Sequence, residues 1–306
     1  MVIISVVIPL LNEEQLVERF LDQLFRELEL MGESFEVVCV DDGSIDSTLG
    51  KLIEFREKHS ELKILSLSRN FGLQSALTAG LDYATGEYVV IMDGDFQDPP
   101  RVVPVLFEKI KSAGADIVTA VRESRNEKFI KKLYINLFHR IFDKLTRGQQ
   151  VAQTGNFCIL GKKAHHAMLR FSERNRYLPG IRNFIGFKHE YILYERPDRL
   201  EGKARMSLPM LFSLAADAIY SFTKWPVRVC LYIGMLGVLT FSAAIVYTLV
   251  SKILGLAPTG WSSMFLAVSF FGSVQLTFLG LIGEYIYRIF KEVQARPLYF
   301  VRKIYD

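Results

Sequence analysis

Two hydrophobic segments that end on aspartates constrain the fold of this chain most strongly. The apolar stretch Phe35–Val40 runs into Asp41–Ser44 (DDGS), and the apolar stretch Tyr88–Met92 runs into Asp93–Asp95 (DGD). A buried strand that stops on carboxylates places them at the carboxyl edge of a parallel sheet, where open α/β folds bind ligands. Two carboxylates one residue apart can hold a hard divalent cation, and such a cation can bridge a diphosphate. The sequence therefore predicts a site for a diphosphate-bearing ligand at this edge.

Strand and helix patterns alternate along the first part of the chain. β-branched apolar runs predict strands, and apolar residues four apart, as in Leu16, Phe20 and Leu24, predict helices. Strands separated by helices imply an α/β fold with a mostly parallel sheet and right-handed crossovers. The expected strands cover residues 3–9, 35–40, 63–67, 88–92 and 116–121, and the expected helices cover residues 13–30, 47–58, 74–84 and 99–113. Farther along, we expect an amphipathic helix over residues 128–145 and strands over residues 157–160 and 191–194.

Two long runs without charged residues, 229–251 and 253–283, follow this pattern. A run of about 20 apolar residues is long enough to cross a bilayer as a helix. We therefore expect a hairpin that crosses the membrane twice, with core helices of a soluble protein as the alternative. Residues 207–223, just before the first run, carry an apolar face at helical spacing and are expected to lie in the membrane interface.

The distribution of Lys and Arg predicts the orientation of this hairpin. Only Lys252 lies between the two runs, whereas the basic residues on either side are Lys224, Arg228, Arg288, Lys291, Arg296, Arg302 and Lys303. This bias places both chain ends on the cytoplasmic side of the inner membrane. The chain begins directly with a strand and shows no signal-peptide pattern, so the large domain is expected in the cytosol. The net charge of +4 is modest and is concentrated near the expected membrane, which favours anionic lipid over nucleic acid as a partner.

The cysteines argue against two kinds of site, and the small residues of the second uncharged run allow close contact between helices. None of the three cysteines has a CxxC neighbour, so neither a zinc site nor a disulfide framework is expected. Small residues recur every three or four positions in the second uncharged run, from Ser269 to Gly283. Such a pattern lets helices approach closely, either within the hairpin or between two copies of the chain. A homo-oligomer formed through these helices is therefore one expectation.

Five segments, in this order, carry a resemblance to a known family: IPLLNEE, VDDGS, LSRNFGLQSALTAGL, MDGDFQDPP and RLEGKARMSL. With the two uncharged runs behind them, they resemble the family-2 glycosyltransferases of the GT-A fold. More narrowly, they resemble the polyisoprenyl-phosphate glycosyltransferases, that is, the dolichol-phosphate-mannose synthase group with its bacterial GtrB-type bactoprenol glucosyltransferases. The resemblance implies a cytosolic GT-A catalytic domain over residues 1–205, amphipathic interface helices over 206–227, two transmembrane helices over 228–290 and a cytoplasmic basic tail over 291–306.

The resemblance also implies how a nucleotide would be held. Pro9, Leu11 and Glu13 match the segment that lines the base pocket, although Leu11 stands where an aromatic residue is usual. Val40 and Asp42 match positions that hold the base and ribose. Asp41 is assigned to the turn before Gly43 instead, since short acids stabilise such turns.

Metal and phosphate contacts are implied at a second group of residues. Asp93, Asp95 and Gln97 match the metal-binding residues of the family, and their oxygens suit Mg²⁺ or Mn²⁺. Asp93 and Gly94 are also expected to contact the substrate, and Asp95 to take part in catalysis. The arginines that match phosphate-binding positions are Arg122, Arg199 and Arg205, with a catalytic role expected for Arg122. Guanidinium groups suit phosphate geometry, although arginines near a membrane can also bind lipid headgroups.

The chain departs from the family at Asn156, which stands where an aspartate is a favoured general base. Asparagine cannot accept the proton. A phosphate acceptor has a second pKa near ~6, so its oxygen is already largely a nucleophile at neutral pH. We therefore hypothesise that Asn156 orients the acceptor or the sugar and that catalysis depends on positioning and charge neutralisation.

The activity that the resemblance implies is transfer of a hexose from a nucleotide sugar to polyprenyl (undecaprenyl) phosphate. UDP-glucose is the expected donor, and the reaction is expected to be metal-dependent and inverting. Relatives also handle mannose and aminoarabinose-type sugars, which stay open as alternatives. A membrane scaffold that binds nucleotide without catalysis is the alternative from another class.

Overall fold

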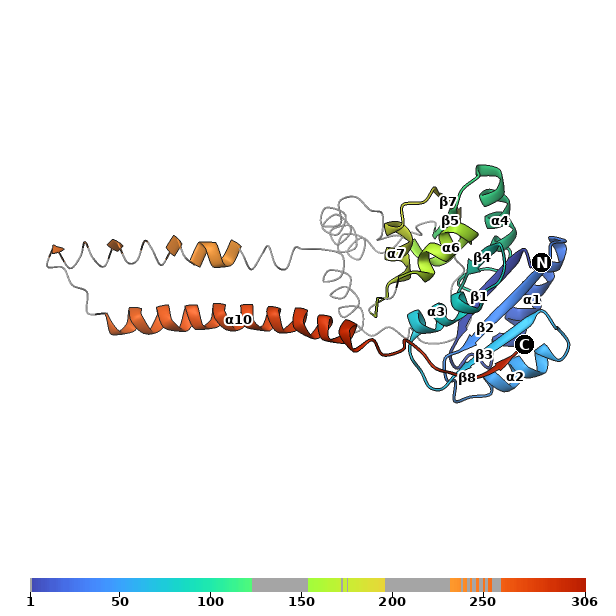
Figure 1. Cartoon of the computed structure of the whole chain (residues 1–306), viewed down its shortest axis with the longest axis horizontal. Coiled ribbons are helices and arrows are strands. Elements are labelled where there is room, and N and C mark those ends of the chain that lie inside the picture. The colour runs from blue at the N-terminus through green and yellow to red at the C-terminus, as the bar shows by residue number, and fades with distance from the viewer. Residues whose placement is uncertain are drawn as a thin grey trace. The chain divides into compact units, whose positions relative to one another are not determined.

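The computed structural model shown in Figure 1 describes most of the large domain and a long C-terminal helix. The described residues are 2–122, 154–171, 173–174, 176–195 and 260–306, together with 232–237, 239–240, 243, 246–247, 250 and 253–254. Two compact units are present, one formed by Met1–Ser207 with Pro297–Asp306 and the other by Leu208–Arg296. The helices expected over residues 128–145 and 207–223, and the predicted site residues Arg199 and Arg205, lie outside the described residues.

One mixed sheet forms the centre of the first unit. Its strand order is β7-β5-β6-β4-β1-β2-β3-β8. The strands are β1 (Ile4–Leu10), β2 (Phe35–Asp41), β3 (Leu62–Leu67), β4 (Tyr88–Ile91), β5 (Ile117–Arg122), β6 (Thr154–Gly161), β7 (His189–Tyr194) and β8 (Val301–Tyr305). β1 pairs parallel with β2 and β4, β2 with β3, and β5 with β7, whereas β6 and β8 run antiparallel to their neighbours. The mostly parallel α/β sheet predicted from the sequence is therefore confirmed.

Helices cover both faces of this sheet because each central strand is apolar on both sides. One buried cluster joins one face of the sheet to α1 (Val17–Leu30), α2 (Thr48–Arg56) and α4 (Val102–Ala113). A second cluster joins the other face to α3 (Leu73–Tyr83), α6 (Lys162–Leu169) and α7 (Leu178–Phe184). Figure 1 shows these two groups of helices on opposite sides of the sheet. The strands and helices expected between residues 3 and 113 correspond to β1–β4 and α1–α4.

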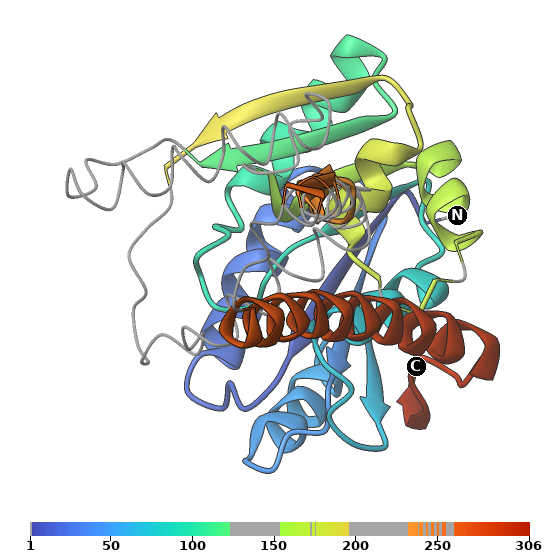
Figure 2. The same ribbon diagram turned by 90° about the vertical axis from the view of Figure 1, so that its left-hand side faces the viewer.

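The parallel strands bring several loops to one edge of the sheet. β1, β2 and β4 end there, and since β6 is antiparallel to both β4 and β5, β5 ends there too while β6 begins there. β7 runs beside β5 in the same direction, as the neighbouring yellow and green strands in Figure 2 show. The segments that follow β1, β2 and β4, the end of β5 and the start of β6 therefore meet at the carboxyl edge. This is the edge at which the sequence predicts a ligand.

The C-terminal strand is the main difference from the expected organisation. The sequence predicts a cytoplasmic basic tail over residues 291–306, but residues 291–294 belong to helix α10 and β8 pairs antiparallel with β3. Ser68 N–H donates to the carbonyl of Phe300 at 2.8 Å, and Tyr299 Oη donates to Asp82 Oδ2 at 2.7 Å. The adjacent exposed residues Arg302 and Lys303 hide the strand pattern of β8 in the sequence, because an edge strand needs little apolar surface. The rest of the expected domain division stays a prediction.

Helix α10 (Trp261–Gln294) dominates the described part of the second unit. Large apolar side chains along it are exposed, among them Met264, Leu276 and Ile286. Gly234, in the segment before it, faces the ring of Phe278: a Cβ at Gly234 would lie 3.3 Å from Phe278 Cζ. Within the described part of the chain, no helix combines the length and the apolarity needed to cross a membrane. The two membrane spans stay predictions from the sequence.

Candidate active site

The carboxyl edge of the sheet collects most of the predicted site residues. Pro9 is in β1, with Leu11 and Glu13 in the loop after it, and Val40 is in β2, with Asp42 following that strand. The loop after β4 holds Asp93, Gly94, Asp95 and Gln97, Arg122 ends β5, and Asn156 lies near the start of β6. Five strands thus contribute residues that are far apart in the sequence.

The loops after β1 and β2 are interlocked by hydrogen bonds. Asn12 N–H donates to Ser44 Oγ at 3.0 Å, and Ile45 N–H donates back to Asn12 Oδ1 at 2.9 Å. Glu13 N–H donates to Thr48 Oγ1 at 2.8 Å. Asn12 adopts a left-handed backbone conformation with φ of 53°, which asparagine tolerates better than most residues. These bonds fix one wall of the site.

Asp46 and Glu14 extend this wall. Asp46 Oδ1 accepts from Thr48 N–H at 3.0 Å, and Asp46 Oδ2 accepts from Glu14 N–H at 3.3 Å. Burial would raise the pKa of Asp46, but its hydrogen bonds with Thr48 and Glu14 outweigh burial and lower it. Glu14 Oε2 accepts in turn from Ser47 N–H at 3.0 Å. The sequence singled out neither Asp46 nor Glu14, although aspartate commonly accepts a hydrogen bond from a backbone N–H two residues ahead.

Asp41 and Asp42 are adjacent but have different environments. Asp41 Oδ1 accepts from Ser44 N–H at 3.0 Å, which agrees with the turn role predicted for it. Both carboxylate oxygens of Asp42 accept backbone N–H groups, from Phe71 at 2.8 Å and from Gly72 at 2.9 Å. These two hydrogen bonds act to lower the pKa of Asp42, but burial outweighs them, and the pKa is raised above its ordinary value. Asp42 therefore organises the loop before α3, and its contact with a ligand stays a prediction.

Gly43 allows the loops after β2 and β3 to touch. It has φ of +73°, and a Cβ at this position would lie 2.6 Å from the carbonyl carbon of Arg69. Only glycine accommodates both the left-handed backbone and the contact. The Arg69 guanidinium lies over the ring of Phe71, 4.2 Å from its centroid.

Val40 is a core residue, and its expected contact with the nucleotide stays a prediction. Its side chain is fully buried in the cluster under α3, so it can face a nucleotide only through its backbone. Pro9 pairs with Val40 in the sheet register and is partly exposed, as are Leu11 and Glu13 in the following loop. The base-pocket role of these three residues stays a prediction.

The loop after β4 carries the predicted metal ligands. Gln97 N–H donates to Asp95 Oδ1 at 3.1 Å, and Phe96 between them has φ of 61°. The ring of Phe96 is buried against Phe20 of α1, with centroids 5.2 Å apart. Gly94 lies against β1, where a Cβ would meet Leu10 Cδ2 at 2.6 Å. Close packing on β1 and α1 therefore explains the glycine and fixes the loop.

The donor set on this loop fits a hard divalent cation. It comprises the carboxylates of Asp93 and Asp95 and the amide of Gln97, which all offer oxygen, the ligand that Mg²⁺ and Mn²⁺ prefer. Among the described residues, no group of three or more His, Cys, Asp and Glu side chains could hold a metal ion. A cation held here would take its other ligands from a diphosphate and water, as Mg²⁺ commonly does in nucleotide sites.

A second set of residues surrounds Arg122 and Asn156. The Arg122 guanidinium lies beside Gly155, since a Cβ there would be 3.8 Å from Arg122 Nη2. Arg182 of α7 is buried, and its Nη2 donates to the carbonyl of Gly155 at 3.0 Å while its Nη1 donates to that of Asn156 at 3.5 Å. Arg182 thus holds the start of β6, although nothing in the sequence around it distinguishes it from a surface arginine.

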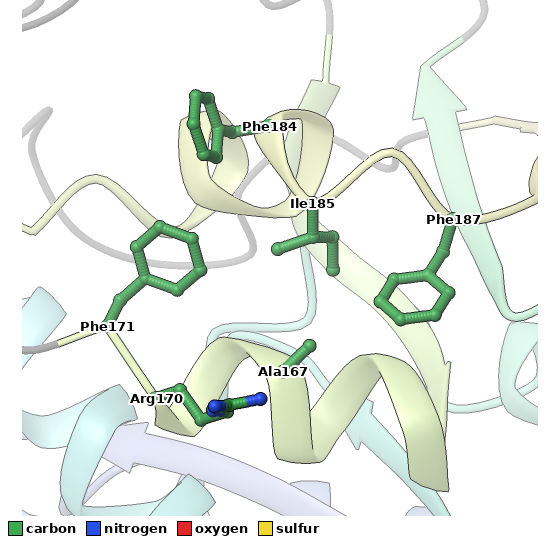
Figure 3. A pocket seen from close by; sticks show the side chains of 6 residues that line it. All are labelled: Ala167, Arg170, Phe171, Phe184, Ile185 and Phe187. Carbon is green, nitrogen blue, oxygen red and sulfur yellow. The ribbon is translucent and has the colours of Figure 1, made fainter.

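A separate pocket lies between α6 and α7 (Figure 3). Its volume is about 420 Å³, and its lining is Ala167, Arg170, Phe171, Phe184, Ile185 and Phe187. None of these residues belongs to the loops after β1, β2 or β4. The pocket is mainly apolar, with one cationic side chain.

Comparisons with known proteins agree with this geometry. The family described as Glycosyl transferase family 2 matches residues 5–172. A glycosyltransferase of Synechocystis is 36% identical over 304 residues, covering 99% of this chain and 95% of the relative. The bactoprenol glucosyl transferase of Shigella phage SfII is 33% identical, covering 98% of this chain and 97% of the relative. A prophage bactoprenol glucosyl transferase homolog of Escherichia coli K12 is 32% identical, with 98% and 99% covered.

Solved structures show the same architecture. Glucosyl-3-phosphoglycerate synthase from Mycobacterium tuberculosis, crystallised with Mn²⁺ and UDP-glucose, has a TM-score of 0.51 and 18% identity, covering 71% of this chain and 76% of that one. Identity at this level shows the fold alone, which is the GT-A α/β fold. With a family match over more than half of its length and relatives above 30% identity along nearly all of it, this chain belongs to glycosyltransferase family 2 and is a glycosyltransferase.

Proposed function

We propose that this enzyme transfers a hexose, with glucose from UDP-glucose as the first candidate, to polyprenyl phosphate. One observation carries the proposal: a single edge of the sheet joins an acidic, amide-containing loop after β4 to the interlocked loops after β1 and β2 and to Arg122. Relatives named as bactoprenol glucosyl transferases align along nearly the whole chain. A solved neighbour with the same fold holds Mn²⁺ and UDP-glucose.

The residues at this edge can divide the work of such a reaction. The loops after β1 and β2, with Asp42, would hold the nucleoside, and Asp93, Asp95 and Gln97 would hold Mg²⁺ or Mn²⁺. The bound ion would neutralise charge on the departing diphosphate. Arg122 would offer a guanidinium fork to phosphate, and Asn156 would orient the acceptor or the sugar. An oxygen of the acceptor phosphate forms the new bond at the anomeric carbon as the bond to the nucleoside diphosphate breaks, which inverts the configuration.

Membrane attachment is a separate part of the proposal. It rests on the uncharged runs 229–251 and 253–283, on the Lys/Arg distribution around them and on the lipid acceptor that the names of the relatives state. Both chain ends and the catalytic domain would lie on the cytoplasmic side of the inner membrane. Exposed apolar side chains along α10 are compatible with lipid contact. Self-association through the small residues of 269–283 remains part of this proposal.

A transfer assay tests the function directly. Purified full-length enzyme is incubated with radiolabelled UDP-glucose, undecaprenyl phosphate and Mn²⁺ or Mg²⁺, and the lipid fraction is analysed for glucosyl phosphate lipid. We expect label in the lipid, loss of it with EDTA, and loss of it in Asp95→Asn. GDP-mannose and an aminoarabinose nucleotide are assayed in parallel to identify the donor. If no donor gives a labelled lipid with either metal, the proposed function is wrong.

A further inference from the structure

Asp98 is a buried carboxylate that closes the loop of the predicted metal ligands. It is 2% exposed, and it stands directly before Pro99 and Pro100 at the end of that loop. Its Oδ2 accepts from the backbone N–H of Asp93 at 3.1 Å, so the two ends of the loop are joined through one side chain. A carboxylate is costly to bury, and a position that retains one in this setting has a structural or functional reason.

The other oxygen of Asp98 reaches across the sheet. Tyr194 Oη, at the end of β7, donates to Asp98 Oδ1 at 2.9 Å. In the sheet order, β5 and β6 lie between β7 and β4. The hydrogen bond therefore joins the end of β7 to the loop after β4, although the two strands are not neighbours. Hydrogen bonds from Asp93 N–H and Tyr194 and the charge of Arg122 act to lower the pKa of Asp98. Burial outweighs them and raises this pKa to about 6.

Tyr194 also contacts the segments that carry the other predicted residues. Its ring packs edge-to-face on Phe157, with centroids 5.6 Å apart, and Phe157 directly follows Asn156. In the register of β5 and β7, Tyr194 pairs with Arg122. The side chain is 6% exposed. Tyr194 is therefore the point where the loop after β4, the end of β5 and the start of β6 meet.

We propose that Asp98 and Tyr194 are positioning residues, whose hydrogen bond sets the Asp93–Gln97 loop in place relative to Arg122 and Asn156. The inference rests on the proposed function, because it assigns this loop to a metal-bound nucleotide diphosphate. Neither side chain needs to touch the substrate. Residues that hold metal ligands in place commonly affect metal affinity by about 10- to 100-fold when changed.

Four variants of the full-length enzyme separate positioning from general stability. Tyr194→Phe removes one hydroxyl and keeps the ring against Phe157. Asp98→Ala removes both acceptors, whereas Asp98→Asn keeps an oxygen for Asp93 N–H and gains an NH₂ that can donate to Tyr194 Oη. The matched control is Tyr191→Phe, a tyrosine on the same strand that is 39% exposed, lies on the opposite face of β7 and stacks on His189.

Binding of Mn²⁺ in the presence of UDP is measured by electron paramagnetic resonance, and kcat and KM for the nucleotide sugar are measured alongside. We expect Asp98→Ala and Tyr194→Phe to weaken Mn²⁺ binding about 10-fold or more, with Asp98→Asn between them and wild type. Tyr191→Phe should stay within about twofold of wild type, as surface changes usually do. Each protein is assayed well below its own unfolding temperature, so a loss of stability alone leaves the affinity unchanged.

The outcomes distinguish the two proposals. If wild type binds Mn²⁺ and UDP and transfers sugar, but Tyr194→Phe and Asp98→Ala bind Mn²⁺ as tightly as wild type, the positioning role is overturned and the proposed function stands. If wild-type enzyme binds no Mn²⁺ with UDP and transfers no sugar, the proposed function fails and the positioning role fails with it. Loss of affinity in Tyr191→Phe equal to that in Tyr194→Phe would also overturn the role.

Discussion

At the residue scale, Asn156 stands where the family resemblance leads us to expect an aspartate as general base. Its backbone carbonyl accepts from the buried Arg182, and Phe157 beside it is 1% exposed and packs on Tyr194. The residue is therefore held from both sides. An anchored amide can orient a ligand through hydrogen bonds even though it accepts no proton.

Replacing Asn156 by aspartate tests this interpretation. A general base typically contributes about 10²- to 10⁴-fold to rate. If the reaction needed a base that this chain lacks, Asn156→Asp would raise the rate by such a factor. We expect instead a change in kcat of less than about 10-fold, because an ionised acceptor phosphate needs no base. The measurement is kcat for transfer to polyprenyl phosphate, with Asn156→Ala as the variant that removes the amide. A rise of orders of magnitude in Asn156→Asp would show that this chain is impaired at a catalytic position.

Glu36 lies near the start of β2, at the edge of the sheet opposite to the predicted site, and its charge stabilises the fold. Its carboxylate accepts from Ser5 Oγ at 2.5 Å and from Thr85 N–H at 2.7 Å, and it pairs with Lys63 Nζ at 2.7 Å. Burial acts to raise the pKa of Glu36, but the bonds from Lys63, Ser5 and Thr85 outweigh it and the pKa is lowered.

A lowered pKa in the folded state gives this carboxylate a predictable pH dependence. Its contribution to the free energy of unfolding is present above the unfolded pKa of about 4.3 and is lost as the pH falls through the lower folded value. We expect Glu36→Gln to reduce the free energy of unfolding by about 1.5–3 kcal/mol at pH 7, with a smaller difference near pH 4. Denaturant unfolding at both pH values measures this. Glu61→Gln, at an exposed position nearby, is the control, and an equal loss in both variants would contradict the assignment.

At the scale of elements, the edge strand β8 links the C-terminus to the nucleotide side of the predicted site. Ser68 donates to Phe300, and Arg302 Nη2 donates to the carbonyl of Ser68 at 2.7 Å. Ser68 leads directly to Phe71 and Gly72, whose N–H groups hold Asp42. The C-terminal strand therefore supports the loop that organises Asp42.

Deleting residues 301–306 should affect both stability and nucleotide binding. Each hydrogen bond with β3 contributes about 0.5–1.5 kcal/mol, so the loss of the strand should lower the free energy of unfolding by at least about 2 kcal/mol. UDP affinity, measured by calorimetry, should fall severalfold because the loop over residues 68–72 loses its support. Lys303→Ala, which removes only an exposed side chain, should retain wild-type affinity. A truncated enzyme that binds UDP like wild type would contradict the link.

The sequence predicts elements well where one local pattern decides them. The strands and helices from residue 3 to residue 113 follow from apolar periodicity, and the acids that end β2 and β4 indicate the functional edge. β8 is different, because it depends on pairing with a strand more than 230 residues away. Asp98 and Arg182 are also invisible locally, since their importance comes from partners on β7 and β6. Val40 fits a family position but is placed in the core by its packing on α3.

At the scale of the whole molecule, the chain leaves one unit and returns to it. Residues 1–207 and 297–306 form one compact unit, and residues 208–296 form the other. The first unit contains both buried clusters and every described residue of the predicted site. Nucleotide binding should therefore depend on the first unit, and use of a lipid acceptor should also require the second.

Replacing residues 208–296 by a Gly/Ser linker tests this division of labour. Closing a long flexible loop costs little more than closing a short one, so a linker of about 30 residues should let β8 pair with β3. We expect UDP affinity within about threefold of wild type, since surface connections seldom change a folded core. Transfer to undecaprenyl phosphate in vesicles should be lost, and adding Asp95→Asn to the linker variant gives the background. Undiminished transfer to the lipid would show that the first unit reaches the acceptor alone, whereas loss of UDP binding would show that the nucleotide site needs both units.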